Sequence, residues 1–324
     1  MKLNITRMIA FFVLASTVGI LYERYLKKYF PDNELDKYEL IKKHLLNETN
    51  HKPILWVHTD YDINNRKWLN FYSRNTNDLN QEYINLCIET IIKYCGDSFN
   101  VFLIDDNAFD KLLPEWSIDL SKVSGLLKKN LRSMGLCQLL YRYGGMRIPN
   151  STIIFKDLIN LYNKSLNDKD MFVGEMINNS LTNQHVSFMP NMEFIGCKKH
   201  SESMKEFISY LEELYSIDHS SNTKIVGNIE KSLFSLVNKR KIRLIPGHLI
   251  GTKTKYSKAV LIDDLLNDTY LELSKNIYCI VIDKEMLMKR SKYNWFLKLS
   301  KQDVIASGTT LGKYLLISKG YNIL

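Results

Sequence analysis

Polar and ionisable side chains follow three apolar runs that have the character of buried strands. A carboxylate can bind sugar hydroxyls, ligate a divalent cation or accept a proton, and an imidazole can contact a substrate. In open α/β sheets, ligands bind at the carboxyl ends of the strands, so the polar residues at these ends are candidates for a functional site. They are His58, Thr59, Asp60, Asp105, Asp106 and Glu175.

These candidates also have plain structural explanations. Asp105 and Asp106 could contact a ribose or a metal ion, but the sequence favours a loop and capping role, with Asp106 as the N-cap of a short helix. His58 could contact a substrate or be a satisfied histidine at a strand end. Glu175, after the run "MFVG", is the best candidate for the base that activates an acceptor.

A second group of candidates follows a helix that ends at Gly144-Gly145. The chain then extends as "MRIPNSTIIF", interrupted by Pro149, which belongs at an edge or a bulge because proline has no N–H for a central ladder. Asn150 and Ser151 in this turn are candidate nucleotide contacts. Strand alternation places Arg147 on the same face as Pro149 and Ser151, where it could stabilise a leaving diphosphate. The alternative for Arg147 is a surface charge on an edge strand.

The elements that must position these residues alternate along the chain. Apolar residues at helical spacing predict a helix over 81–95, and further helices are expected over 123–143, 202–215, 225–238 and 301–306. Strands are expected at 53–60, 100–109, 146–155, 171–175, 192–197, 242–245 and 278–282. This alternation predicts an α/β fold with a mixed, mainly parallel sheet flanked by helices. With 324 residues and 45% hydrophobic content, the chain can bury a sizeable core.

The N-terminus contains the longest apolar run, "MIAFFVLASTVGILY" from Met8 to Tyr22. Because the sequence has no other long apolar run, this one favours a signal-anchor helix. We expect it to hold the protein in a membrane as a single-pass type II protein, with the globular part lumenal or external, although basic residues on both sides do little to fix the orientation. A cleaved signal peptide, which would make the protein secreted, and a docking helix are the alternatives. We therefore expect an anchor segment over 1–30, a polar stem over 31–52 and a globular domain over 53–324.

Charge and cysteine content exclude several classes. The formal charge is +9, but the basic residues are scattered, and clusters such as Lys128-Lys129 are too short for a nucleic-acid-binding tail. We expect no nucleic-acid partner, and most of these charges should lie on solvated faces. The five cysteines are odd in number and widely spaced, which argues against a disulfide framework or a zinc site and favours buried free thiols.

The order "ILWVH", "FLIDD", "LLKKNLRSMGLCQLLYRYGG" and "MRIPNSTIIFKDL" resembles the DXD-containing glycosyltransferases of the fungal α-1,6-mannosyltransferase and capsular-polysaccharide type. The resemblance covers about Pro53 to Leu158 and implies a GT-A fold, a nucleotide-sugar donor and a glycan or glycoprotein acceptor. In that family an Asp and an Arg in the helix precede Tyr-Gly-Gly, and an Asp-x-Asp on the next strand holds Mn²⁺ or Mg²⁺ against the diphosphate.

All four of those functional positions differ in this chain. Aligned on Gly144-Gly145, the two motif aspartates fall on Pro149 and Ser151, the helix Asp on Ser133 and the helix Arg on Leu136. Proline offers no ligand, and a neutral hydroxyl is a poor one alone. We therefore expect no metal site and no metal cofactor, and the family's catalytic residues cannot be carried over.

The stretch "YINLCIETIIKYCGDSFNVFLIDD" is also similar to uncharacterised proteins from large DNA viruses, which share the Pro-Asn-Ser turn. Together these patterns favour a glycosyltransferase-like protein without metal-dependent catalysis, which binds a glycan or nucleotide or has a structural role. The alternative is an active transferase, a hexosyltransferase, that uses basic side chains such as Arg147 and Lys156 in place of a metal. A hydrolase on a similar fold is a third class, since fold does not fix function.

Overall fold

The computed structural model describes residues 41, 52–59, 81–178, 186–217 and 222–320. The chain divides into two compact units, Met1–Asn50 and His51–Leu324. Apart from Ile41, every described residue belongs to the second unit, which contains all the elements below.

A six-stranded sheet forms the centre of this unit, in the order β2-β1-β3-β6-β5-β7. β1 is parallel to β2 and β3, β5 is parallel to β7, and β6 is antiparallel to both of its neighbours. Five strands therefore run in one direction and β6 alone is reversed. The strands are β1 (Ile54–His58), β2 (Asn100–Ile104), β3 (Gly145–Ile148), β5 (Met171–Ile177), β6 (Phe188–Cys197) and β7 (Arg243–Ile245).

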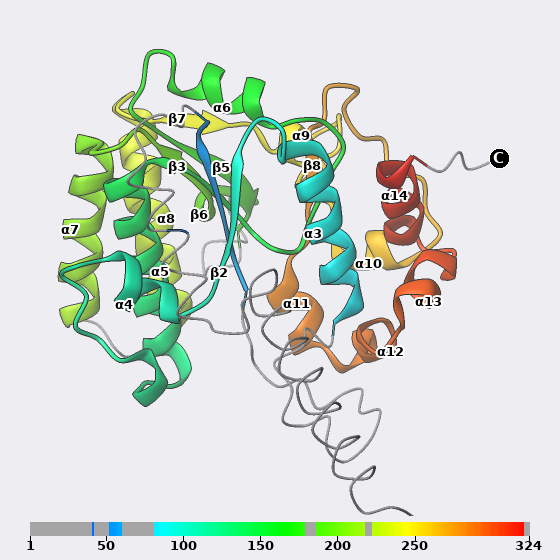
Figure 1. Cartoon of the computed structure of the whole chain (residues 1–324). Coiled ribbons are helices and arrows are strands. Elements are labelled where there is room, and N and C mark those ends of the chain that lie inside the picture. Colours follow the sequence, from blue (N-terminus) through cyan, green and yellow to red (C-terminus); the bar gives the residue numbers. More distant parts are fainter. Residues whose placement is uncertain (1–40, 42–51, 60–80, 179–185, 218–221, 321–324) are drawn as a thin grey trace, which may run out of the picture. The chain divides into compact units, whose positions relative to one another are not determined.

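Helices flank the sheet, as the sequence predicted. Figure 1 shows α5, α7 and α8 together on one side of the strands, and α3 with the C-terminal helices on the other. The mixed, mainly parallel α/β architecture is therefore confirmed. The helices are α3 (Glu82–Cys95), α4 (Asn107–Leu112), α5 (Gly125–Tyr143), α6 (Ile159–Leu166), α7 (Glu202–Ile217), α8 (Asn222–Asn238), α9 (Gly247–Ile250), α10 (Ile262–Leu266), α11 (Lys284–Lys289), α12 (Asn294–Leu297), α13 (Lys301–Ala306) and α14 (Thr310–Lys319), with 3₁₀ turns η2 (Leu120–Lys122) and η4 (Ser291–Tyr293).

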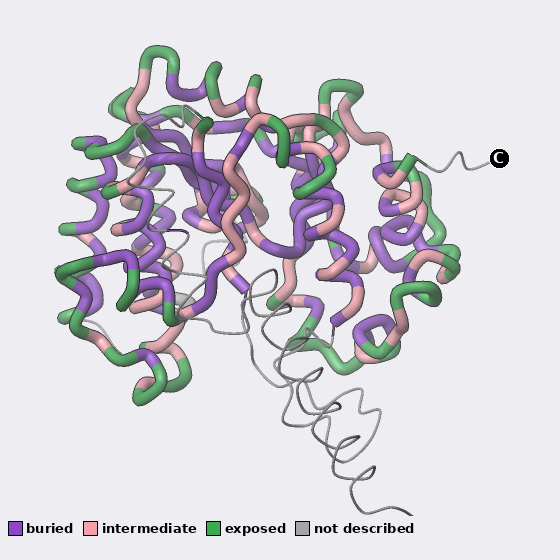
Figure 2. The backbone as a smooth tube through the Cα atoms, in the orientation of Figure 1, coloured by how far each residue is buried: buried purple, intermediate pink, exposed green. Residues whose placement is uncertain are grey.

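Buried residues follow the strands and one face of the flanking helices (Figure 2). The apolar positions that predicted α3 are all buried: Ile84, Cys87, Ile88, Ile91 and Cys95. All five cysteines of the chain are buried and free, as expected. Burial raises the pKa of the Cys95 thiol to about 12, so this thiol stays protonated at neutral pH.

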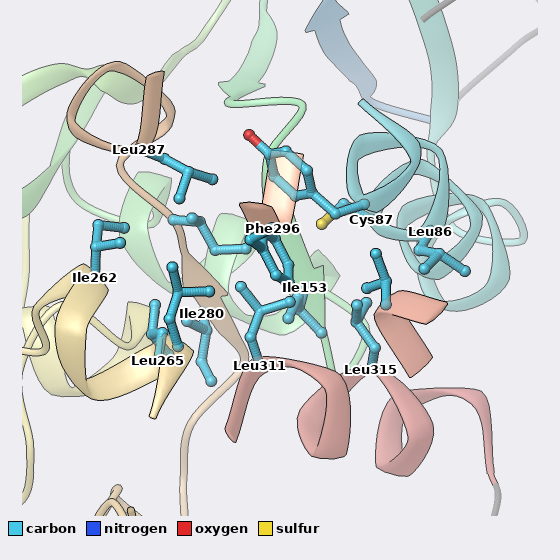
Figure 3. Close-up of a cluster of buried hydrophobic side chains, with 14 of the residues drawn as sticks. Leu86, Cys87, Ile153, Ile262, Leu265, Ile280, Leu287, Phe296, Leu311 and Leu315 are labelled. Atoms are coloured by element: carbon cyan, nitrogen blue, oxygen red, sulfur yellow. The ribbon is translucent and has the colours of Figure 1, made fainter. Parts of the chain in front are cut away.

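Besides the core along the large sheet, a hydrophobic core joins α3 to the C-terminal helices. It surrounds a separate two-stranded sheet, in which β4 (Thr152–Ile154) pairs antiparallel with β8 (Cys279–Val281). Figure 3 shows α3, β4, β8, α10, α11, α12 and α14 all contributing side chains, among them Leu86, Ile153, Ile280, Phe296 and Leu311. Pro149 ends β3 and the chain then leaves the large sheet, so the extended run predicted over 146–155 is two strands in two sheets.

The predicted membrane localisation does not hold. Among the residues that the structure describes, no helix is both long enough and apolar enough to cross a bilayer. The run Met8 to Tyr22, on which the prediction rested, lies outside the described residues.

Candidate functional site

A cavity of about 520 Å³ opens at the carboxyl ends of β1 and β2. These strands are parallel, with His58 opposite Ile104, so Thr59 and Asp105 emerge side by side at one edge of the sheet. α4, the loop that follows it and the first turns of α5 complete the wall. The lining residues are Thr59, Asp105, Asp106, Asn107, Asp110, Trp116, Ser117, Ile118, Asp119, Leu120, Ser121, Lys128 and Arg132.

Asp106 is the centre of the charged wall. Arg132 binds it through two N–H groups, Nε to Oδ1 at 2.6 Å and Nη2 to Oδ2 at 2.7 Å. Lys128 Nζ lies 3.3 Å from Oδ2, and His58 Nε2 lies 3.0 Å from Oδ1. The cation pair is possible because residues 128 and 132 are four apart on α5 and share one helix face.

This surrounding keeps Asp106 ionised. Partial burial alone would favour the neutral acid, but the hydrogen bonds from His58 and Arg132 and the Arg132 charge outweigh it and hold the pKa of Asp106 well below its usual range. The phenyl ring of Phe109 stacks on His58, with the ring centroids 6.1 Å apart, and fixes the imidazole against Asp106.

Asp106 is the N-cap residue of α4, as the sequence predicted. Its side chain makes no capping bond and is turned to Arg132 instead, because the guanidinium is the stronger partner for this carboxylate. The side chain that binds the start of α4 is that of Asp105. Its Oδ1 accepts the backbone N–H of Asn107 at 2.9 Å, and the side chain is buried.

The opposite wall is the loop after α4. Trp116 packs against Phe109, with the ring centroids 5.1 Å apart, and its Nε1 donates to the carbonyl of Ile118 at 2.6 Å. Asp119 accepts from the backbone N–H of Ser121 at 3.0 Å and from its hydroxyl at 2.6 Å. These local bonds hold a carboxylate and a hydroxyl at the cavity mouth.

Of the other predicted residues, Thr59 lines the cavity, and its hydroxyl donates to the carbonyl of Ile104 at 3.1 Å. Asp60 lies outside the described residues. Glu175 does not line the cavity: it is on β5, where its carboxylate accepts from Lys253 Nζ at 2.6 Å and from the backbone N–H of Gly247 at 2.9 Å.

Arg147 is not the surface charge on an edge strand that was its structural alternative. It lies on β3, between β1 and β6, and only 7% of the residue is exposed. Its guanidinium donates to the Glu193 carboxylate at 2.7 Å and to the carbonyl of Met192 at 3.2 Å. The predicted catalytic roles of Arg147 and Glu175 stay predictions, and both side chains have ionic partners within the fold.

The turn that carries the altered motif is part of the fold's framework. Asn150 and Ser151 are both buried. The Ser151 hydroxyl donates to the carbonyl of Ile282 at 2.7 Å, and the Ser151 carbonyl accepts the Ile282 N–H at 3.0 Å. This turn therefore offers no carboxylate at the two motif positions: Pro149 has no side-chain ligand, and the neutral Ser151 hydroxyl is already bonded to a carbonyl. Such a pair does not fit a divalent metal, which prefers carboxylate oxygens. Among the described residues, no three His, Cys, Asp or Glu side chains lie where they could hold a metal ion together.

The sequence has Arg132 one helical turn from Leu136, the position of the family's helix arginine, but it predicts neither Arg132 nor Lys128 in a cavity wall. It placed Lys128-Lys129 on a solvated face, which holds for Lys129: this side chain pairs with Glu285 on α11. Lys128 instead faces Asp106. The available signal was the four-residue spacing of Lys128 and Arg132, but that spacing alone does not show which face of α5 turns to β2.

Comparison with known proteins gives distant structural likenesses. No protein-family model matches the chain, and no curated protein matches it. Similar solved structures include the apo form of the glycosyltransferase GlyE of Streptococcus pneumoniae TIGR4, with 13% identity, a TM-score of 0.36 and coverage of 61% of this chain and 46% of GlyE. A glycosyltransferase involved in glycosylation of the major capsid of PBCV-1 has 10% identity and a TM-score of 0.39, covering 75% of this chain and 98% of its own.

Mouse xyloside xylosyltransferase 1, also in its apo form, has 8% identity and a TM-score of 0.41, with coverage of 72% and 98%. At TM-scores below 0.5 these likenesses carry no conclusion about the activity, substrates or metal of this chain. The function must therefore be argued from the cavity itself.

Proposed function

We propose that this chain is a glycosyltransferase-like protein that binds a nucleoside diphosphate sugar in the cavity at the ends of β1 and β2, without a metal ion held by the DXD positions. If the protein transfers the sugar, the acceptor is a glycan or a glycoprotein. The location supports the proposal because open α/β sheets bind ligands at the carboxyl edge of parallel strands.

The observation that carries the proposal is the division of the cavity wall into two kinds of side chain. Asp105 and Asp119 offer carboxylates near the strand ends and the mouth, as suits ribose or sugar hydroxyls, which are hydrogen-bond donors. Lys128 and Arg132 offer positive charge on α5, as suits phosphate oxygens. A nucleoside diphosphate sugar presents both kinds of group in one molecule.

The two positions that hold the metal in a DXD site do not carry carboxylates in this chain. Pro149 has no side-chain ligand atom, and the Ser151 hydroxyl donates to the carbonyl of Ile282, directly after β8. The Tyr-Gly-Gly frame next to them is kept for the fold: Tyr143 Oη donates to the carbonyl of Leu112 at 2.7 Å, and the Gly144 carbonyl accepts from Trp56 Nε1 at 3.0 Å. The chain therefore has the Tyr-Gly-Gly frame of the motif without its two metal-binding carboxylates.

An active, metal-independent transferase remains the second candidate, with Glu175 as the proposed base. Glu175 is only partly exposed and is bonded to Lys253, so deprotonation of an acceptor would require the carboxylate to exchange this partner for the acceptor hydroxyl. Binding of the donor is common to both candidates and is the property to test first.

The test is a variant that fills the cavity. Ser117 is an exposed loop residue of the lining, so Ser117→Trp should occupy the mouth without disturbing the core. Titration calorimetry of the full chain with UDP, GDP and their sugars should show binding that is lost in Ser117→Trp. Ser291→Trp, at an exposed position in η4, is the matched control and should bind as the unaltered chain does. Binding that survives Ser117→Trp would place the ligand elsewhere and contradict the proposal.

A further inference from the structure

We infer that Lys128 and Arg132 form a diphosphate-binding pair, which takes the place in this cavity that a divalent metal has in a DXD site. The inference rests on the proposed function and adds to it the residues that hold the phosphates. It concerns two side chains that no sequence motif assigns.

The geometry shows that the two cations can share one anionic oxygen. Asp106 Oδ2 lies 2.7 Å from Arg132 Nη2 and 3.3 Å from Lys128 Nζ, so both positive groups already converge on a single point. Phosphate oxygens favour the same donors as carboxylate oxygens, and a guanidinium binds either through paired N–H groups.

The positive charge of the cavity lining lies on α5. Lys128 and Arg132 bring two positive charges, which balance the carboxylates of Asp105 and Asp106 before His58 is considered. Asp110 and Asp119 also line the cavity, but Asp119 pairs with Lys122 at 3.1 Å and Asp110 with Lys111 at 3.2 Å. An anion that enters this cavity therefore finds its cationic partners on α5.

Both cations are accessible enough to meet a ligand yet fixed enough to select one. Their side chains are 28% and 17% exposed, so neither is a fully solvated charge and neither is enclosed. The basic residues of the motif strand are differently placed: Arg147 is buried against Glu193, and Lys156 donates to the carbonyl of Lys275 at 2.9 Å. In the described part of the chain, the lysine and arginine side chains lining this cavity are Lys128 and Arg132.

The experiment compares three probes by calorimetry in the presence of EDTA: inorganic pyrophosphate, a nucleoside diphosphate (UDP or GDP) and the matching nucleoside. Lys128→Met removes one cation. Lys129→Met is the matched control, since its residue is the next on the same helix but pairs with Glu285. Arg132→Lys keeps the charge and removes the paired N–H geometry. It tests the second residue without leaving Asp106 wholly unpaired.

We expect the affinity for pyrophosphate and for the nucleoside diphosphate to fall about tenfold in Lys128→Met and in Arg132→Lys, and to be unchanged in Lys129→Met. The affinity for the nucleoside should not change in any variant. Equal diphosphate affinity in Lys128→Met and the unaltered chain would overturn the inference and leave the proposed function standing. Pyrophosphate binding without nucleotide binding would keep the cation pair and overturn the proposed function. Absence of binding by all three probes would overturn both.

Discussion

At the residue scale, the cavity is organised around one carboxylate rather than around a pair. Asp105 and Asp106 are adjacent in sequence, yet one begins a helix and the other receives a lysine, an arginine and a histidine. The two carboxylates therefore have different partners: the Asp106 oxygens face cationic side chains, and Asp105 Oδ1 accepts a backbone N–H.

Asp106 should make the stability of the protein depend on pH in the acid range. Folding lowers the pKa of Asp106, so its contribution is fully present above the ordinary aspartate pKa of about 4 and is lost as the pH falls below it toward the folded-state value. Asp106→Asn should cost about 2 kcal/mol of unfolding free energy at pH 7, since it leaves Arg132 and Lys128 without their counter-ion.

The measurement is urea unfolding of the unaltered chain and Asp106→Asn at pH 7, pH 5 and pH 3. The difference between them should be similar at pH 7 and pH 5 and smaller at pH 3. Asp97→Asn is the control. Asp97 is an exposed residue just before the amino-terminal end of β2, whereas the cavity lies at the carboxyl end of this strand, so the variant should show little effect at any of these pH values. A difference that grows at pH 3 would contradict the assignment.

At the element scale, the turn from α5 into β3 sets the position of the whole motif strand. Gly144 and Gly145 both have positive φ, +75° and +99°. A Cβ on Gly145 would lie 2.2 Å from the carbonyl oxygen of Ile54, because β3 pairs with β1 immediately after this residue. The second glycine of the motif is therefore required by the approach of two backbones, whether or not the site catalyses a reaction.

Gly145→Ala should accordingly lower the free energy of unfolding far more than a glycine-to-alanine change whose only cost is the positive φ. We expect a loss of more than about 3 kcal/mol, or failure to fold, because the contact is with the main chain of a buried strand. Gly308→Ala is the matched control, with φ +68° but no atom within 4 Å of the new Cβ, and should cost about 1 kcal/mol. Urea unfolding of both variants measures the difference, and equal losses would refute the steric explanation.

The elements that the sequence predicted are those with long periodic patterns. α3 and α5 were found within a few residues of their ends, and the capping box of Ser300 and Asp303 at the start of α13 is present. The sequence predicts a buried stripe on α5 through Leu127, Leu131, Met134, Cys137 and Tyr141. This prediction is partly wrong: Leu127 is 43% exposed, and the buried face also runs through Leu136 and Leu140. α9, α10, α11 and α12 were missed, because helices of four to six residues are too short to show a period. The longer helices α6 and α14 were missed as well.

At the scale of the whole globular unit, strand order decides which candidates can meet. β5 stands three places from β1 in the sheet, which at about 4.8 Å per strand separates Glu175 from the cavity by roughly 14 Å. Strand order is set by tertiary packing, so the sequence could identify polar strand ends but could not group them. The pairing of β4 with β8 was equally hidden, since those strands are distant in the chain.

The central claim is that the cavity at β1 and β2 binds a nucleoside diphosphate without a metal ion. Its most direct test is calorimetric titration of the full chain with UDP and with GDP, each in EDTA and then in Mn²⁺. At least one of the two nucleotides should bind, with an affinity that is the same in both conditions, because Lys128 and Arg132 supply the positive charge. Binding that requires Mn²⁺, or no binding of either nucleotide by a folded sample, would contradict it.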